Sequence, residues 1–276
     1  NTTFIVDRTG EVCEACGGGA YYRALLKGCK KGSRLASGMA ALEAYTLRLM
    51  RLRTRVDAFL APSLFLRDRL LARGFPRHKV HHLPLFLPPE QFIDGSEHGG
   101  YLLYLGRLEP IKGIRPLLRA CRATPQVYLL LAGRCEGALA GELATLLPAN
   151  AYYVGLKQGR QLRRLLSRAL AVVVPSLCYE NQPFSILEAF GAGKPVITSR
   201  LGGMAELVPH GERGLLVAPG DVDGLAEAMS WMAAHPDEAR RMGGAAQAYA
   251  RRAHGAAEHY ARLMQIYGSC VMAVHM

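Results

Sequence analysis

The segment from residue 101 to residue 217 alternates between short apolar runs and amphipathic runs, and this alternation restricts the fold more than any other feature of the chain. The apolar runs are typical of buried strands, whereas the runs between them have the spacing of helices. Strands that are apolar on both faces belong in a parallel sheet that helices cover on both sides. We therefore predict an α/β fold with a doubly wound parallel sheet. Strands are expected at residues 101–105, 127–132, 151–154, 171–174, 196–199 and 215–217, and helices at 115–122, 138–147, 161–167, 184–190 and 204–208.

The chain on either side of this segment has a different pattern. Residues 1–90 hold only two further strand candidates, which are too few for a complete sheet domain. A Pro-rich stretch after residue 83 has no periodicity and is interpreted as a linker. We predict a partial N-terminal domain at 1–90, a ligand-binding domain at 99–254 and a C-terminal helix at 255–276 that packs back on the N-terminal part. The further strands are expected at 58–61 and 80–83, and the further helices at 35–55, 63–73, 221–235, 236–254 and 256–272.

The net charge is +12, and the excess lies in the first 90 residues, which hold 15 Lys and Arg against 7 Asp and Glu. A basic surface attracts anionic partners such as phosphates or anionic lipid headgroups. Two interpretations of Arg48, Arg51, Arg53 and Arg55 stay open: a solvated face and peripheral contact with an anionic membrane. Nucleic acid is not expected as a partner, because basic and aromatic residues do not alternate and no nucleic-acid-binding motif is present.

Cysteine content and hydropathy bear on the compartment. The seven cysteines are an odd number spread through apolar segments, which is typical of reduced thiols in a cytosolic protein. No apolar run approaches the roughly 18 residues that a membrane-spanning helix needs. We therefore expect a cytoplasmic protein, with peripheral contact at the inner face of the membrane as the alternative.

The motif GRLEPIKG, at residues 106–113, lies between a predicted strand and a predicted helix. Gly106 permits a tight turn and a close approach of the backbone to a ligand. Arg107 and Lys112 bring two cations to the carboxyl edge of the sheet, where doubly wound folds bind their ligands. Paired cations suit a diphosphate group. The alternative is an ordinary strand–helix loop with solvated basic residues.

The segment PSLCYENQPFSILEAFGAGKPVITS, at residues 175–199, holds two glutamates with seven residues between them. Glu180 lies in a loop, and Glu188 lies inside the helix that follows, where it can accept hydrogen bonds from adjacent hydroxyls such as those of a ribose. The start of this helix presents free N–H groups at Phe184 and Ser185, which favour a phosphate. The alternatives are a solvated carboxylate at Glu188 and, at Glu180, an acid that interacts with the helix dipole.

A third element, SRLGGMAELV at residues 199–208, places Gly202 and Gly203 between a strand and a short helix. Successive backbone N–H groups in such a loop can bind an anion, although a flexible turn is the alternative for this element alone. All three elements follow strands of the predicted parallel sheet. They are therefore expected to converge on one edge, and this convergence is more specific than any single motif.

In the order and spacing of these elements the sequence resembles glycosyltransferase family 4, the group 1 retaining enzymes with the GT-B fold. GRLEPIKG is similar to the family's GR-x4-KG element, ENQPFSILEAFGAGKPVITS to its E-x7-E element, and LGGMAELV to the Gly-Gly-x-x-E that follows. The resemblance covers roughly residues 58–231. It implies two Rossmann-like domains, of which residues 99–254 would bind a nucleotide-sugar donor and residues 1–90 would be the remnant of an acceptor-side domain.

The resemblance also implies roles for single residues. Arg107 and Lys112 would hold the donor diphosphate, and Glu180 would face the donor sugar and the reaction centre. Glu188 would bind the nucleotide ribose. Backbone N–H groups of the second helix would bind phosphate, and two glycines would lie near the diphosphate; these residues are Phe184, Ser185, Gly106 and Gly203. The family usually requires no metal cofactor, because the cations replace Mg²⁺.

The N-terminal part departs from the family pattern, since no opening strand with a Gly-rich loop is found before residue 58. We therefore expect an N-terminal truncation. The leading hypothesis is a retaining hexosyltransferase that moves a sugar from a UDP- or GDP-linked donor to a glycan, lipid-linked or small acceptor, for example in cell-envelope polysaccharide assembly. The alternative is a non-catalytic nucleotide-sugar-binding module or inactive fragment. A dinucleotide-dependent oxidoreductase is disfavoured, because no G-x-G-x-x-G opens the first helix.

Three cysteines near the start, Cys13, Cys16 and Cys29, have the spacing of three ligands of a structural zinc site. A fourth ligand is not evident in the sequence. The two interpretations that we keep are a structural zinc site and a loop with reduced cysteines.

Overall fold

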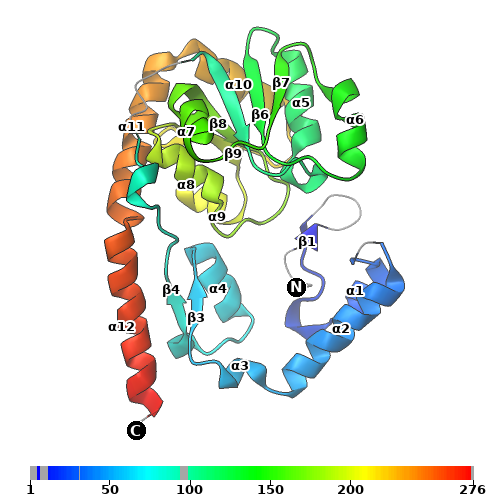
Figure 1. Ribbon diagram of the computed structural model, residues 1–276. Coiled ribbons are helices and arrows are strands. Elements are labelled where there is room, and N and C mark those ends of the chain that lie inside the picture. The colour runs from blue at the N-terminus through cyan, green and yellow to red at the C-terminus, as the bar shows by residue number, and fades with distance from the viewer. Residues whose placement is uncertain (1–4, 7–11, 31, 94–98, 275–276) are drawn as a thin grey trace.

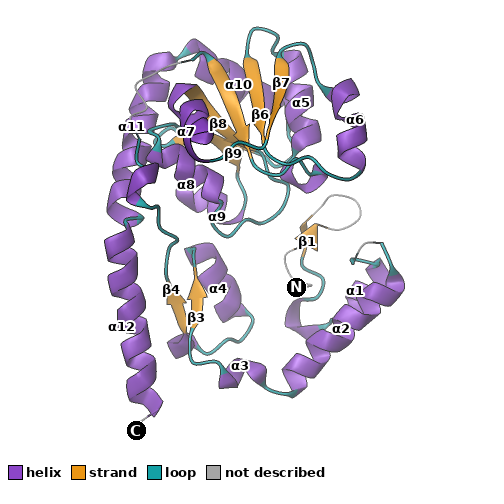
Figure 2. Ribbon diagram, viewed as in Figure 1, coloured by secondary structure: helices purple, strands orange, loops and turns teal. Residues whose placement is uncertain are grey.

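The structure, a computed structural model, describes residues 5–6, 12–30, 32–93 and 99–274 (Figures 1 and 2). It divides into an N-terminal region, up to residue 93, and a C-terminal region, residues 99–254. The long helix α12, Ala256–Val274, follows the C-terminal region and extends past the strands of the N-terminal region in Figure 1.

The C-terminal region is built on a six-stranded, wholly parallel sheet with the order β10-β9-β8-β5-β6-β7. The chain begins in the middle of this sheet, moves outward to β7 and then returns to β8 on the other side of β5. The order therefore reverses between β5 and β8, which is where doubly wound sheets open a crevice for ligands. The strands are β5 Tyr101–Leu105, β6 Tyr128–Ala132, β7 Ala151–Gly155, β8 Ala169–Val174, β9 Val196–Ser199 and β10 Gly214–Val217.

Helices cover both faces of this sheet, and neighbouring strand residues point to opposite faces. Leu102 and Tyr104 lie in one buried cluster with α5, α6 and α10, whereas Leu103 lies in the other with α7, α8 and α9. The helix α11 contributes to both clusters. These helices are α5 Ile114–Ala123, α6 Ala138–Leu146, α7 Gly159–Arg168, α8 Phe184–Gly191, α9 Gly202–Leu207, α10 Val222–Ala234 and α11 Pro236–Ala253.

The predicted strands and helices of this region are confirmed within a few residues. The strands at 101–105 and 196–199 have the predicted bounds. The largest difference among the strands is the start of β8 at Ala169, two residues early, whereas β6, β7 and β10 each differ by one residue. All six residues of β8 are buried, which explains why the run of apolar residues predicts its position well.

The N-terminal region has smaller sheets. Strands β3 and β4 form a parallel pair, and α4 connects them as predicted. Strands β1 and β2 form an antiparallel pair that the sequence did not predict. The elements are β1 Ile5–Val6, β2 Val12–Cys13, α1 Tyr22–Lys27, α2 Arg34–Leu49, α3 Leu52–Arg55, β3 Phe59–Ala61, α4 Leu64–Ala72 and β4 Val80–His82.

The prediction of one long helix at 35–55 is wrong. The helix α2 ends at Leu49, and Arg51 adopts a left-handed backbone conformation with φ of 49° before α3 begins. A left-handed residue cannot continue a right-handed helix, so the chain changes direction there. The apolar and basic residues that continue the helical pattern hide this break in the sequence.

The Pro-rich segment between the two regions lies against the C-terminal region along much of its length. Leu87 is completely buried, and its N–H donates to the carbonyl of His254 at 2.8 Å. The Nδ1 atom of His254 lies 2.7 Å from the carbonyl oxygen of Leu85, and that of His259 lies 2.7 Å from the carbonyl oxygen of Pro84. The predicted linker is thus a fixed connection, and the first turn of α12 contacts it through His259.

Across the described ranges, no helix combines the length and the apolar character that a bilayer crossing requires. Beyond its first turn, α12 carries exposed apolar side chains, among them Tyr260 and Tyr267. That residues 255–276 pack on the N-terminal part stays a prediction.

Candidate functional site

A cavity of about 170 Å³ opens at the carboxyl ends of β5 and β8, where the strand order reverses. Six of the eight residues for which a nucleotide-sugar role was predicted line it: Gly106, Arg107, Lys112, Glu180, Phe184 and Ser185. The remaining wall comes from Tyr104, Leu105, Val174, Ser176 and Pro183. Segments that are about 70 residues apart in the sequence thus meet at one place, as the parallel sheet requires.

Close contact between two loops brings Lys112 and Glu180 together. The loop after β5 contacts the loop after β8, with the N–H of Leu177 donating to the carbonyl of Ile111 at 2.9 Å. Gly113 has φ of 76°, and a Cβ there would lie 1.9 Å from the carbonyl oxygen of Pro175. Only glycine fits this approach, which explains the glycine that follows Lys112 in the motif.

The carboxylate of Glu180 is held by two donors. Lys112 Nζ donates to Oε1 in an ion pair whose side chains are 22% and 19% exposed. Ser176 Oγ donates to the same oxygen at 2.9 Å. Lys112 is therefore ion-paired with Glu180. The other carboxylate oxygen of Glu180 has no partner among the described residues.

Arg107 lies at the rim of the cavity. Its side chain is 65% exposed and forms an ion pair with Glu109 over 2.6 Å. Exposed ion pairs of this kind contribute only about 0–1 kcal/mol, so the guanidinium can change partner at little cost. The backbone beside it is more rigid, since the buried hydroxyl of Tyr104 donates to the carbonyl of Arg107 at 2.6 Å.

The helix α8 points its N-terminus into the cavity. Pro183 is the N-cap residue and supplies no side-chain hydrogen bond, and Ile186 is the first residue of the helix whose N–H bonds back to Pro183. The N–H groups of Phe184 and Ser185 have no acceptor in the part of the chain that the structure describes. Unpaired N–H groups and the helix dipole together favour an anion at this position.

Glu188 lies deeper, one turn into α8, and is not among the residues that line the cavity. Burial raises the pKa of its carboxyl group to about 7, and no described side chain donates a hydrogen bond to it. A half-buried carboxylate without a donor is costly in its charged form. The depth of this group was not evident from the sequence, which placed it only inside a helix.

Gly203 contacts the loop that carries Glu180 through its backbone. Its N–H donates to the carbonyl of Glu180 at 2.9 Å, and a Cβ there would lie 1.8 Å from the carbonyl oxygen of Asn181. Gly203 does not line the cavity. The structure therefore uses this N–H within the protein, where the sequence had suggested a second backbone site for an anion.

Sequence reasoning missed two side chains at this site, Ser176 and Tyr179. Ser176 follows the buried strand β8 directly, and a polar residue at such a strand end was a signal that could have found it. The hydroxyl of Tyr179 donates to Glu14 at 2.8 Å, a residue from the N-terminal region. No local pattern in the sequence indicates this second contact.

The structure does not support the predicted zinc site. Within the described residues, no three His, Cys, Asp or Glu side chains gather in a group that could hold a metal ion. Cys16 is buried against Tyr21, Ala24 and Ala41, and Lys27 Nζ lies 3.3 Å from Cys13 Sγ. All seven cysteines lie in described segments, and none forms a disulfide. Two of the three cysteines pack in this small cluster instead, with Cys16 buried and Cys29 partly buried.

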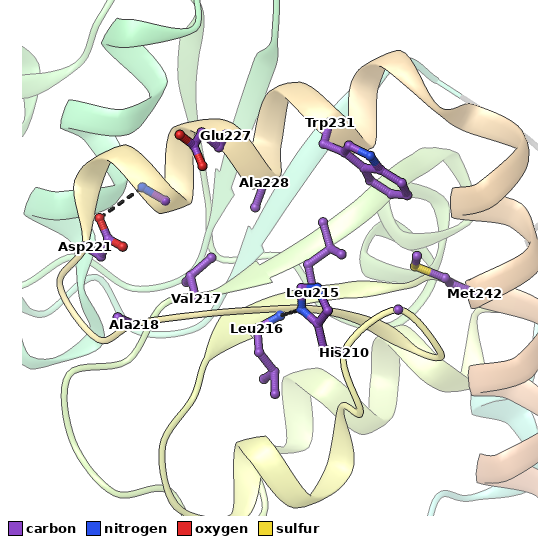
Figure 3. Close-up of a pocket in the computed structure, with 12 residues that line it drawn as sticks. His210, Leu215, Leu216, Val217, Ala218, Asp221, Glu227, Ala228, Trp231 and Met242 are labelled. Carbon is purple, nitrogen blue, oxygen red and sulfur yellow. Dashed lines mark hydrogen bonds between the residues drawn. The ribbon is translucent and has the colours of Figure 1, made fainter.

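A larger cavity of about 540 Å³ lies at the outer edge of the sheet, between β10 and α10 (Figure 3). Its walls include Leu215, Trp231 and Met242, and the N–H of Leu216 donates to Nδ1 of His210 at 3.0 Å. None of the predicted site residues lines it. By volume alone, this larger cavity would be chosen as the ligand site. The two cations, Arg107 and Lys112, and the free N–H groups of α8 lie at the smaller cavity instead.

Comparison with solved structures defines the class of fold. HepE from Anabaena in complex with UDP superimposes with a TM-score of 0.71 at 20% identity, over 78% of this chain and 64% of HepE. Sucrose-phosphate synthase from Thermosynechococcus elongatus has a TM-score of 0.71 at 26% identity, over 83% of this chain and 62% of that chain. The fold is therefore that of a GT-B glycosyltransferase.

Sequence comparison identifies the family. Residues 99–235 match the model of the family described as glycosyl transferases group 1. The D-rhamnosyltransferase WbpZ of Pseudomonas aeruginosa is 34% identical over 151 residues, which is 54% of this chain and 40% of WbpZ. Through its C-terminal region the chain belongs to the group 1 glycosyltransferases, and it spans less than half of the length of this relative.

Proposed function

We propose that the chain is the donor-binding half of a retaining glycosyltransferase, which moves a hexose from a UDP- or GDP-linked donor to a glycan, lipid-linked or small acceptor. One observation carries the proposal. Two cations, a carboxylate and the free N-terminus of α8 converge on a single cavity at the switch point of the sheet. The membership of residues 99–235 in the group 1 family supports the same assignment. Assembly of a cell-envelope polysaccharide is the process that we propose for it.

The cavity suits a diphosphate. The N–H groups of Phe184 and Ser185 would donate to phosphate oxygens, and Arg107 would turn from Glu109 to the same group. Lys112 lines the same cavity, paired with Glu180, and would share its charge with the phosphates. Three sources of positive charge make a metal cofactor unnecessary for neutralising the leaving group.

The two glutamates suit hydroxyl groups. Glu188 lacks a donor within the described residues, so ribose hydroxyls would supply the hydrogen bonds that its buried carboxylate needs. The unpaired oxygen of Glu180 would accept from a hydroxyl of the donor sugar. In the transfer step, the bond from the sugar C1 to the phosphate oxygen breaks and a bond from C1 to the acceptor oxygen forms on the same face. The acceptor proton passes to the leaving phosphate.

Titration calorimetry with UDP and with GDP tests the assignment. We expect Arg107→Ala and Lys112→Ala to weaken binding of the preferred nucleotide about tenfold or more, because each removes a charge-assisted hydrogen bond. Arg115→Ala is the matched control, since Arg115 also forms an exposed ion pair, with Glu142, and does not line the cavity. Equal binding by the wild type and by both site variants would remove the diphosphate assignment.

A non-catalytic nucleotide-sugar-binding module is the second candidate, because the separate buried cluster among the described residues of the N-terminal region has only four members. Release of free sugar from UDP-glucose or GDP-mannose, measured over hours, separates the two candidates. Slow hydrolysis that Glu180→Gln abolishes supports the enzyme. Tight binding without hydrolysis or transfer supports the module.

Peripheral contact with an anionic membrane, on the cytoplasmic side, is a further part of the proposal. Leu35, Met39, Leu42 and Leu49 lie at helical spacing on α2 and are 78%, 65%, 67% and 85% exposed. Arg34 and Arg48 lie on the same helix. An exposed apolar stripe with cations beside it suits anionic lipid.

Sedimentation with vesicles tests this contact. Vesicles that contain phosphatidylglycerol should bind the wild type more tightly than vesicles of phosphatidylcholine. Leu42→Gln should reduce this binding, whereas Leu156→Gln, at an exposed position of the C-terminal region, should not. Binding that is insensitive to lipid charge would contradict the proposal.

A further inference from the structure

The cysteine-bearing segment, residues 12–16, has no assigned role once the zinc site is removed. The packing of this segment fixes the position of Glu14. Cys16 is buried in the small cluster with Tyr21, Ala24 and Ala41, and the carbonyl of Glu14 accepts from the N–H of Gly17 at 2.9 Å. Glu14 therefore lies on a short, anchored turn between β2 and the first helices.

The carboxylate of Glu14 extends from this turn to two other parts of the chain. Its Oε1 accepts from the hydroxyl of Tyr179 at 2.8 Å, and its Oε2 lies 2.6 Å from Arg69 Nη1 on α4. Arg69 Nη2 also donates to the hydroxyl of Tyr179 at 3.0 Å. Three side chains, from the turn after β2, from α4 and from the loop after β8, thus form a closed hydrogen-bonded triangle.

Ring contacts support the same position of Tyr179. The ring of Tyr179 lies 4.8 Å from that of Phe65, and the Arg69 guanidinium lies 5.3 Å from each ring centre. Cation–π contacts of this kind add to the hydrogen bonds where water is partly excluded. Tyr179 is therefore held on its ring and on its hydroxyl by the N-terminal region.

Tyr179 directly precedes Glu180, whose side chain is held by Lys112 and Ser176 and whose carbonyl is held by Gly203. The N-terminal region thus fixes Tyr179, and the C-terminal region fixes the next residue of the same loop, Glu180. A shift of Tyr179 changes the backbone of Glu180, and misplacement of a group at a reaction centre by about 1 Å can reduce a rate 100-fold.

We propose that Glu14 and Tyr179 are positioning residues, which fix the loop that carries Glu180 and so couple the N-terminal region to the donor site. This inference rests on the proposed function only for its effect on catalysis. The contact itself, between the cysteine-bearing segment and the donor loop, goes beyond the roles that the family elements assign, since Tyr179 precedes the E-x7-E element and Glu14 lies far from all three elements.

The test uses Tyr179→Phe, which removes one hydroxyl, and Glu14→Gln, which removes one charge. The first readout is amide hydrogen exchange of residues 176–185 without nucleotide, and we expect exchange about tenfold faster in both variants. The second is hydrolysis of the donor that the wild type binds. We expect kcat to fall about tenfold while KM stays within about twofold.

The controls are matched in chemistry. Tyr101→Phe removes a hydroxyl that donates to Leu165 at 2.8 Å in the C-terminal region. Glu142→Gln breaks an ion pair with Arg115, away from the cavity. The double variant of Glu14 and Tyr179 should be no slower than either single variant, because both changes break one network.

The outcomes separate this inference from the proposed function. A wild type that neither binds nor hydrolyses nucleotide-sugars would remove the proposed function, and hydrogen exchange would then decide the coupling alone. Unchanged exchange of residues 176–185 in both variants would overturn the inference. An increase in KM with unchanged kcat would also overturn it, since it would indicate a role in binding and not in positioning Glu180.

Discussion

The two regions of this chain differ in how they are held together. The C-terminal region has two extensive buried clusters, one on each face of its sheet. Among its described residues, the N-terminal region has one separate buried cluster, of Cys16, Tyr21, Ala24 and Ala41. Large apolar side chains of α1 and α2 are exposed, for example Leu26 at 67% and Leu49 at 85%.

This difference shows where the stability of each region originates. Buried apolar area stabilises the C-terminal region directly, at about 25 cal/mol per Å². The N-terminal region relies more on polar contacts with its neighbour. Both carboxylate oxygens of Glu206, on α9, accept from N–H groups at the start of α4, at 3.0 Å each. Together with Glu14 and the Pro-rich segment between the two regions, this contact holds the N-terminal region in place.

The largest expected effect comes from truncating a core side chain in each region. Phe190→Ala, at a fully buried position of the C-terminal region, should cost about 3–5 kcal/mol. Tyr21→Ala should cost about 1–2 kcal/mol, because its small cluster can collapse around the gap. Trp231, the only tryptophan, lies on α10, so its fluorescence reports unfolding of the C-terminal region. In a urea titration this fluorescence should show the loss of stability in Phe190→Ala and no loss in Tyr21→Ala. A shift of the Trp231 midpoint in Tyr21→Ala would mean that the regions unfold as one unit.

The next effect is a dependence on pH of opposite sign in the two regions. Burial raises the pKa of Glu188 to about 7 from 4.5, so stability that its neutral form provides is lost as pH rises from about 4.5 to 7. This loss is about 3 kcal/mol. For Glu14, burial acts to raise the pKa, but the hydrogen bond of Tyr179 and the charges of Arg69 and Arg73 outweigh it and lower the pKa. The stability that Glu14 provides is present above pH 4.5 and is lost as pH falls below it.

Thermal unfolding between pH 4 and 8 checks these signs. Glu188→Gln should be more stable than the wild type at pH 8, with the difference vanishing near pH 4.5. Nucleotide binding should strengthen as pH rises from 6 to 8 in the wild type and stay level in this variant, because ribose hydroxyls stabilise the charged carboxylate. Parallel stability curves for the wild type and Glu188→Gln would contradict the assignment of the raised pKa.

A smaller effect distinguishes tight from loose packing of helices. In α11, a Cβ on Gly243 would lie 2.1 Å from the carbonyl oxygen of Gly193, so Gly243→Ala should cost about 1–3 kcal/mol. Gly244→Ala, where the Cβ meets nothing within 4 Å, should stabilise by about 0.5–1 kcal/mol. In α2, the Cβ of Gly38→Ala meets only the end of the Leu25 side chain, at 3.3 Å, and this partly exposed side chain can move. Circular-dichroism melting of the three variants should therefore give one loss and two gains.

The smallest effect concerns the contact between the regions. Glu206→Gln keeps one acceptor for the start of α4 but removes the charge, at a cost of about 1 kcal/mol. Amides of α4 should exchange faster in this variant, while those of α5 should not change. Glu227→Gln, at an exposed position of α10, is the control. Equal exchange of α4 in both variants would show that the contact does not hold the N-terminal region.

Local patterns of the sequence were sufficient for the fold of the C-terminal region and for the convergence of its motifs on one cavity. Buried strands need unbroken apolar runs, and the carboxyl ends of parallel strands meet at one edge, so the motifs after β5 and β8 had to converge. Gly113 illustrates the same point, since a close approach of two loops admits no other residue. These constraints act within short windows of sequence and can be recognised there.

The tertiary structure decided which partners the site residues have. The pairing of Lys112 with Glu180, the depth of Glu188 and the contact of Tyr179 with Glu14, 165 residues away, leave no pattern in any short window. Cys13, Cys16 and Cys29 had the sequence spacing of metal ligands. In the folded chain, however, they do not form a group that could hold a metal ion. The physical reason is that charge pairing and burial depend on which distant segments the core brings together. Until that packing is known, several side chains of the same type are equally plausible partners for a given charge.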